Sequence, residues 1–232
     1  MEQLQSSLLK YFLKDSSINI VSCDKMMVRS KGPVWHQKQK KQNIIPERLH
    51  GVDRQATWGK SAAKGWVYGH GTFSIVTHDI PILGMFAWMP NSGNEAKRME
   101  QEIVKYHSLV KIACMDSKAD DSEFYFNLQK NYGMQLLTRC RKRMDKTPIR
   151  KLMIKQMAAR KFKKIYQQRS TTVEPMQGLV DNIFDLETAW MRGEENNRWL
   201  FAAMGAAVQM AQLQAYKNHQ STWNIKSLVL GT

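Results

Sequence analysis

Short apolar runs and amphipathic stretches alternate along this chain and predict a mixed α/β architecture. Stretches rich in β-branched, aromatic and apolar residues predict strands at residues 18–23, at 65–78 and 80–89 as a β-hairpin, at 109–114 and at 135–138. The first strand is expected to be buried and to deliver Asp24 at its C-terminal end. Asp116 follows the strand at 109–114 at a distance of two residues.

Helical spacing of apolar residues dominates the other segments. Helices are predicted at residues 95–107, at 121–132 with Asp121 or Ser122 as the cap, at 147–166 with Pro148 in the first turn, and at 198–217. Val173, Met176 and Val180 recur at helical spacing, so Glu174 is expected at the start of a helix with a buried face.

This order of elements predicts one α/β domain over residues 18–197, with a central mixed sheet flanked by helices. Residues 1–17 are predicted to form an N-terminal helix or tail. Residues 198–232 are predicted to form a C-terminal packing helix and tail. Residues 29–64 are rich in Lys, Arg, Gln and Gly without a clear period, so we expect a basic insertion after the first strand. Sites in such sheets gather at the carboxyl ends of strands.

Charge adds a candidate partner to this picture. The chain has 232 residues, 43% hydrophobic content and a formal net charge of +15, as expected of a globular protein that binds a polyanion. Residues 139–169 hold 13 Lys or Arg residues and one acid, Asp145. A solvated helix face is the alternative, but so lopsided a run favours nucleic acid. The expected contacts are Arg139, Arg141, Lys142, Arg143, Lys161, Lys163 and Lys164.

Several other classes of protein are disfavoured. The N-terminus shows neither a secretory signal nor a basic amphipathic or lipidated anchor, so no membrane partner is expected. The most apolar run, residues 199–208, is shorter than the roughly 20 residues that span a bilayer. The 3 cysteines form no CxxC pair, which argues against a disulfide framework or a zinc knuckle. We therefore expect a cytoplasmic protein, associated with the nucleoid when it binds DNA.

Three carboxylates could support phosphodiester chemistry. Mg²⁺ prefers oxygen ligands, and two such ions roughly 3.5–4 Å apart can stabilise the attacking and leaving oxygens. Asp24 and Asp116 at strand ends and Glu174 on a helix would supply these ligands from different elements. On pattern alone, ordinary strand-end acids remain the alternative, because the chain has 20 acids.

Several segments resemble the DDE transposases of bacterial insertion sequences. They extend from about residue 20 to the C-terminal helix, and the run from 24 to 69 is the most specific. The segments are residues 24–36 (DKMMVRSKGPVWH), 51–53 (GVD), 58–61 (WGKS), 64–69 (KGWVYG), 115–120 (MDSKAD), 166–169 (YQQR), 171–178 (TTVEPMQG) and 190–193 (WMRG).

The resemblance implies an RNase H-like fold with Asp24 and Asp116 on neighbouring strands and Glu174 on a flanking helix. It implies that these three carboxylates hold two Mg²⁺ or Mn²⁺ ions. The reaction would be cleavage of double-stranded DNA at transposon ends by water, followed by attack of the freed 3′-hydroxyl on target DNA. Tyr166 and Arg169 would contact DNA phosphate or a displaced base, and the resemblance also allows a homodimer.

The chain departs from the family's pattern at three points. Ala119 replaces a tyrosine, Asp181 replaces a lysine that would contact the transposon end, and little sequence precedes Asp24. These departures keep a second hypothesis open, a truncated and decayed transposase that binds DNA without cutting. A third is an RNase H-like nuclease without strand transfer. Trp35, among cations, could stack on unpaired bases or pack in a core.

Overall fold

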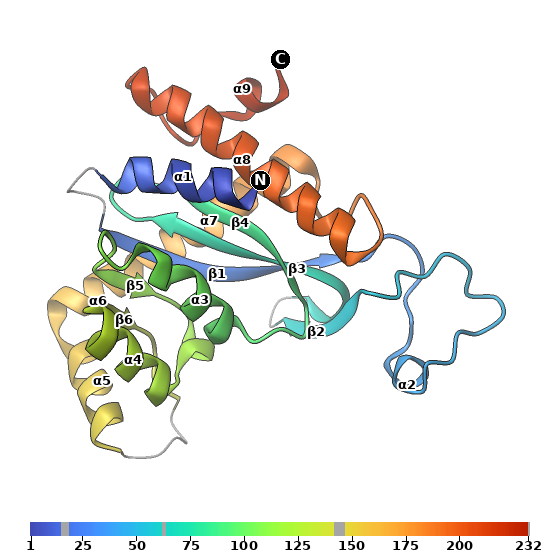
Figure 1. Ribbon diagram of the computed structural model, residues 1–232, viewed down its shortest axis with the longest axis horizontal. Coiled ribbons are helices and arrows are strands. Elements are labelled where there is room, and N and C mark those ends of the chain that lie inside the picture. The colour runs from blue at the N-terminus through green and yellow to red at the C-terminus, as the bar shows by residue number, and fades with distance from the viewer. Residues whose placement is uncertain (15–18, 62–63, 142–146, 232) are drawn as a thin grey trace.

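The computed structural model describes residues 1–14, 19–61, 64–141 and 147–231, and the described residues contain one mixed sheet flanked by helices (Figure 1). The strands follow the order β2-β3-β1-β5-β6, and β4 also pairs with β3. Strands β1, β5 and β6 are parallel, whereas β3 is antiparallel to its partners. The strands are β1 Ile20–Arg29, β2 Thr57–Ser61, β3 Gly65–Thr77, β4 Leu83–Pro90, β5 Ile112–Cys114 and β6 Gln135–Leu137. The expected α/β class and its mixed sheet are confirmed.

Helices cover both faces of the sheet because side chains alternate along its strands. Val21 and Cys23 of β1 pack with α3 and α4, whereas Val28 packs with α7 and α8. None of the helices in the described ranges is long and apolar enough to cross a membrane. The helices are α1 Glu2–Leu13, α2 Gln37–Lys41, α3 Glu95–Ile103, α4 Ser122–Tyr132, α5 Pro148–Ala158, α6 Arg160–Gln167, α7 Val173–Phe184, α8 Glu194–Lys217 and α9 Lys226–Leu230.

Strand β1 corrects the expectation that Asp24 ends a strand. The strand continues to Arg29, and every residue from Val21 to Arg29 has a partner in β3. Asp24 lies opposite Ser74 in mid-strand. The strand continues because the long β3 pairs with it beyond the acid, and this pairing is not visible in the local sequence.

The predicted helix over residues 147–166 is also corrected. It is two helices, α5 and α6, separated at Ala159, which has an extended backbone (φ −66°, ψ 130°). The break lets the two halves pack on different partners. Met153 of α5 joins the core that contains α4, whereas Tyr166 of α6 packs with Cys114 of β5.

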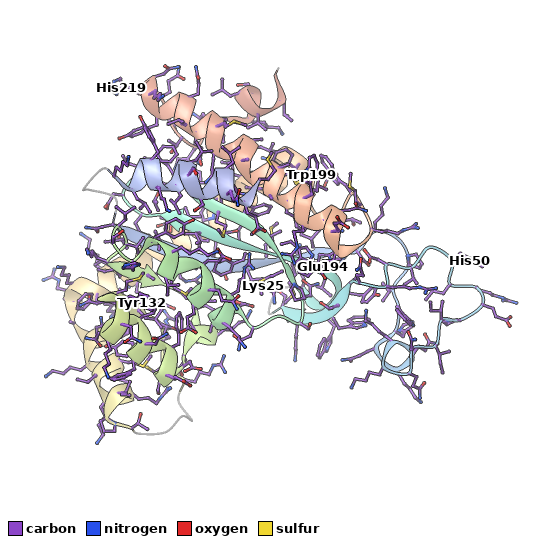
Figure 2. The ribbon with its side chains drawn as sticks, in the orientation of Figure 1. Lys25, His50, Tyr132, Glu194, Trp199 and His219 are labelled. Carbon is purple, nitrogen blue, oxygen red and sulfur yellow. The ribbon has the colours of Figure 1, made fainter. Side chains whose placement is uncertain are left out.

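The segment expected as an irregular insertion, residues 29–64, has structure of its own. Arg29 belongs to β1, and the segment also contains the short helix α2 and strand β2. It projects from the sheet, with His50 near its far end (Figures 1 and 2). A small core of Trp35, Ala56 and Tyr68 holds it together.

A buried network of hydrogen bonds connects this segment to the sheet. The Asp53 carboxylate pairs with His70 Nε2 at 2.9 Å, and Trp88 Nε1 donates to His70 Nδ1 at 3.0 Å. The amide of Gly193 also donates to Asp53, at 2.9 Å. These partners come from β3, β4 and the start of α8, so Asp53 has a structural role in joining distant parts of the chain.

Buried glutamine side chains cover the free edge of β4. Gln5 of α1 accepts from the Phe86 amide at 2.7 Å and donates to its carbonyl at 3.2 Å. From α8, Gln212 accepts from the Leu83 amide, and Gln209 donates to the Gly84 carbonyl, both at 2.8 Å. The N-terminal segment, expected as a helix or a tail, forms the helix α1, which joins α8 in satisfying an edge strand that would otherwise be open to pairing.

Candidate active site

Asp24 lies within β1, and Asp116 caps the turn that follows the neighbouring parallel strand β5. Ser22 of β1 is in register with Cys114 of β5, and each aspartate follows two residues later. Side-chain alternation therefore directs both carboxylates to the face of the sheet that α7 covers. Asp116 Oδ1 accepts from the Lys118 amide at 2.8 Å, which fixes the turn after β5.

Glu174 reaches the same face from the first turn of α7. Val173 and Met176 anchor that helix in the core, and Gln177 donates to Ser74, the register partner of Asp24, at 3.4 Å. The Glu174 side chain is 51% exposed. Its carboxylate is therefore more exposed than that of Asp24, whose side chain is 18% exposed.

Arg169 joins two of the three carboxylates. It lies in a short 3₁₀ helix (Gln168–Thr171) between α6 and α7. Its guanidinium contacts Asp24 Oδ2 at 3.4 Å and Glu174 Oε1 at 3.0 Å. The Arg169 and Asp24 side chains are only 14% and 18% exposed, so this contact is largely shielded from water. Asp24 and Glu174 thus come within reach of one cation.

The electrostatics of Asp24 show how unfavourable its negative charge is. The pKa of Asp24 is raised to about 6, mainly by burial and to a smaller extent by the neighbouring Glu95 and Asp116. The Arg169 guanidinium and the Lys25 amide act in the opposite direction but do not restore the ordinary value. Burial lowers the pKa of Arg169, but the nearby Asp24, Glu174 and Asp116 carboxylates help to raise it above its ordinary value. The site therefore favours additional positive charge.

The donor set fits a hard divalent cation in kind, because it consists of carboxylate oxygens from several elements. In the parts of the chain that the structure describes, no group of three His, Cys, Asp or Glu side chains is arranged to hold a metal ion. Arg169 lies between two of the three carboxylates. A metal ion bound by all three would therefore require the guanidinium to move.

Exposed cations flank the site on α6 and after β6. Lys161, Lys163 and Lys164 are exposed on α6, which runs directly into the segment that carries Arg169. Arg139 and Arg141 are also exposed. Lys142 and Arg143 lie outside the described residues.

Tyr166, expected to contact DNA, is 8% exposed and packs beside Cys114 and Leu137. The Arg139 guanidinium lies 5.7 Å from the centre of its ring. Tyr166 therefore lies below the surface formed by the α6 lysines, and its ring is largely covered in this structure.

A cluster of Lys25, Glu95 and Lys118 beside the site was missed from the sequence. Glu95 Oε1 lies 3.4 Å from Lys25 Nζ and 2.7 Å from Lys118 Nζ. Glu95 is buried, and its other oxygen has no hydrogen-bond partner among the described residues. Side-chain alternation in β1 could have predicted that Lys25 lies on the sheet face opposite Asp24. The sequence around Glu95 did not indicate that Glu95 pairs with Lys25.

Ala119 and Asp181, which differ from the transposase motifs, each have a defined place in the structure. Ala119 is fully buried in the core. Asp181 Oδ1 accepts from the Leu186 amide at 2.9 Å and so helps to end α7. Trp35, which could have stacked on bases, is buried, whereas Trp66 is 58% exposed and has Lys60 Nζ 5.9 Å from the centre of its ring.

No protein-family model matches the chain, and no curated protein matches it. The function is therefore inferred from the carboxylates, the cations around them and the motifs in the sequence.

Proposed function

We propose that this protein is a DDE transposase with an RNase H-like catalytic domain, in which Asp24, Asp116 and Glu174 hold two Mg²⁺ or Mn²⁺ ions. The observation that carries the proposal is the placement of the carboxylates. Asp24 in β1 and Asp116 in the turn after the neighbouring parallel strand β5 each lie two residues beyond a register pair, and one guanidinium contacts Asp24 together with Glu174 from the flanking helix α7.

The roles of the chain's own residues follow from their surroundings. Asp24 is set rigidly in mid-strand, and Asp116 is held by the turn after β5, so both would orient ligands with little freedom. The more exposed Glu174 would complete the set from the side on which DNA approaches. Two bound ions would supply charge stabilisation at the attacking and leaving oxygens of a phosphodiester.

Double-stranded DNA is the proposed partner. The α6 lysines form an exposed cationic surface that leads into the site through Arg169. Phosphate contacts of this kind position a duplex without reading its sequence. Arg139 and Arg141 would extend the same surface from the end of β6.

Cleavage of supercoiled plasmid tests the proposal. The wild type is expected to nick plasmid in Mg²⁺ or Mn²⁺ and to stop in EDTA. Asp24→Asn, Asp116→Asn and Glu174→Gln should keep duplex binding and lose nicking, whereas the matched change Asp121→Asn, at the cap of α4, should keep both. Nicking by all three carboxylate variants in Mn²⁺ would reject the assignment.

Two other candidates have distinct outcomes in this assay. A wild type that binds duplex but never nicks it is the result expected of a decayed transposase, the reading that Asp181 favours by placing an anion where the family has a lysine. Nicking without joining of a 3′-hydroxyl end to target DNA is the result expected of a nuclease. Sizing of labelled products separates hydrolysis from strand transfer.

A further inference from the structure

Arg169 lies between the proposed DNA-binding helix α6 and the helix α7 that carries Glu174. Its chain neighbours are α6, with the exposed lysines, and α7, with Glu174. Its carbonyl accepts from the Thr172 amide at 3.2 Å, and the Met176 amide donates to the Thr172 carbonyl at 3.1 Å. The Arg169 backbone is therefore tied to the start of α7, while its side chain reaches down to Asp24.

The guanidinium and a divalent cation would compete for the same oxygens. Arg169 binds Asp24 Oδ2 and Glu174 Oε1. The neighbouring lysines, Lys25 and Lys118, are both engaged with Glu95. Removal of the guanidinium would leave a partly buried Asp24 beside Glu174 and Asp116 without its main counter-charge, and such a group strongly attracts a replacement cation.

A DNA phosphate is the natural competitor for the Arg169 side chain. Guanidinium groups can bind phosphate, as they bind carboxylate, with two parallel hydrogen bonds. A backbone drawn to Lys163 and Lys164 on α6 would bring a phosphate within a few residues of Arg169.

We propose that Arg169 exchanges between the carboxylates and a DNA phosphate, so that duplex binding raises the affinity of the carboxylates for a divalent cation. The inference rests on the proposed function and adds a coupling between its two ligands. Because coupling between binding sites is reciprocal, the cation also tightens duplex binding by the same factor. The protein then holds its cations firmly only when DNA is in place.

Mn²⁺ binding to the 232-residue chain tests the exchange, with free Mn²⁺ followed by electron paramagnetic resonance. The titration is done with and without a 20-base-pair duplex, and the duplex-only blank is subtracted. For the wild type, the duplex should raise Mn²⁺ affinity about tenfold, within the roughly 5–150-fold range of typical couplings. Arg169→Gln should bind Mn²⁺ about tenfold more tightly than the wild type without DNA, and the duplex should then have little further effect.

The matched control is Arg198→Gln, which removes another arginine paired with a glutamate, Glu194 at 2.7 Å on α8. It should behave as the wild type. If Arg169→Gln does not fold by circular dichroism, Arg169→Lys replaces it. A lysine cannot span both carboxylates, so this variant should also bind Mn²⁺ more tightly than the wild type without DNA.

The outcomes separate the two proposals. Equal Mn²⁺ affinity of the wild type and the Arg169 variant, with binding still abolished by Asp24→Asn, overturns the exchange and leaves the metal site standing. An undiminished duplex effect in the Arg169 variant overturns it as well. Failure of every variant to bind Mn²⁺, with or without duplex, contradicts the proposed function itself.

Discussion

The ionised carboxylate of Asp24 destabilises the folded protein, and we attribute this cost to function. A partly buried carboxylate beside Asp116 and Glu95 is unfavourable when ionised, and its pKa rises to about 6. The rise from 3.8 corresponds to about 3 kcal/mol against the ionised form. Strain of this kind is common where a protein holds a group ready for a ligand.

Asp24→Asn is therefore expected to stabilise the protein in EDTA at pH 8, by about 2–3 kcal/mol. In the unfolded chain Asp24 ionises near 3.8, and in the folded protein near 6. The wild type consequently loses stability relative to the variant as pH rises from about 4 to about 6, and the difference stays constant above that. Urea unfolding of both proteins from pH 3.5 to 8 measures it. A difference that does not change with pH would contradict this account of Asp24.

At the scale of elements, a buried ion pair fastens α5 to the turn that follows Asp116. Arg150 of α5 makes two hydrogen bonds to Asp120, at 2.6 and 2.7 Å, and both side chains are almost fully buried. The Arg141 amide also donates to Asp120, at 2.6 Å. These contacts hold Arg141 and the helix α5 beside the candidate site.

Asp120→Ala should cost about 3–5 kcal/mol, because it removes the carboxylate that makes two hydrogen bonds to a buried guanidinium. Hydrogen exchange should show lost protection across α5. The neighbouring change Asp121→Ala is the control, since it removes only the cap of α4 and should cost about 1 kcal/mol. Equal losses of unfolding free energy in the two variants would show that the Asp120–Arg150 pair does not anchor α5.

Elements with strong local patterns were predictable, and elements defined by distant partners were not. The hairpin of β3 and β4 and the cap of α4 by Asp121 follow from alternation and capping chemistry. The extension of β1 past Asp24 depends on pairing with β3. The break at Ala159 involves no proline or glycine, so nothing in the local sequence indicated it.

In the candidate site, too, some features were predictable from the sequence and others were not. The resemblance to the transposase motifs grouped Asp24, Asp116 and Glu174, and the structure brings Asp24 and Glu174 to one guanidinium. The contact with Arg169 and the Lys25–Glu95–Lys118 cluster join residues far apart in the chain. No periodic pattern carries that information, because such pairs depend on how elements pack.

For the whole molecule, the net charge of +15 is expected to act mainly through the α6 surface. Each phosphate neutralised adds about 0.9 to the slope of log affinity against log salt. Replacing Lys161, Lys163 and Lys164 together by glutamine should therefore reduce that slope by about 2–3. Fluorescence anisotropy with a labelled duplex from 50 to 300 mM salt gives the slope.

The matched control replaces three exposed lysines on the α1 and α8 side of the molecule, Lys10, Lys14 and Lys217. It removes the same charge and should change the slope by less than about 1. Equal changes in both triple variants would mean that DNA is held by diffuse charge and not by the α6 surface.

The central claim is that Asp24, Asp116 and Glu174 form one metal centre. Anomalous diffraction from crystals grown with Mn²⁺ and a short duplex measures this most directly. The account predicts a Mn²⁺ peak whose ligands are oxygens of all three carboxylates, at about 2.0–2.6 Å, with Arg169 turned away from Asp24. Mn²⁺ bound elsewhere, or the absence of any peak at these carboxylates with duplex in place, would contradict it.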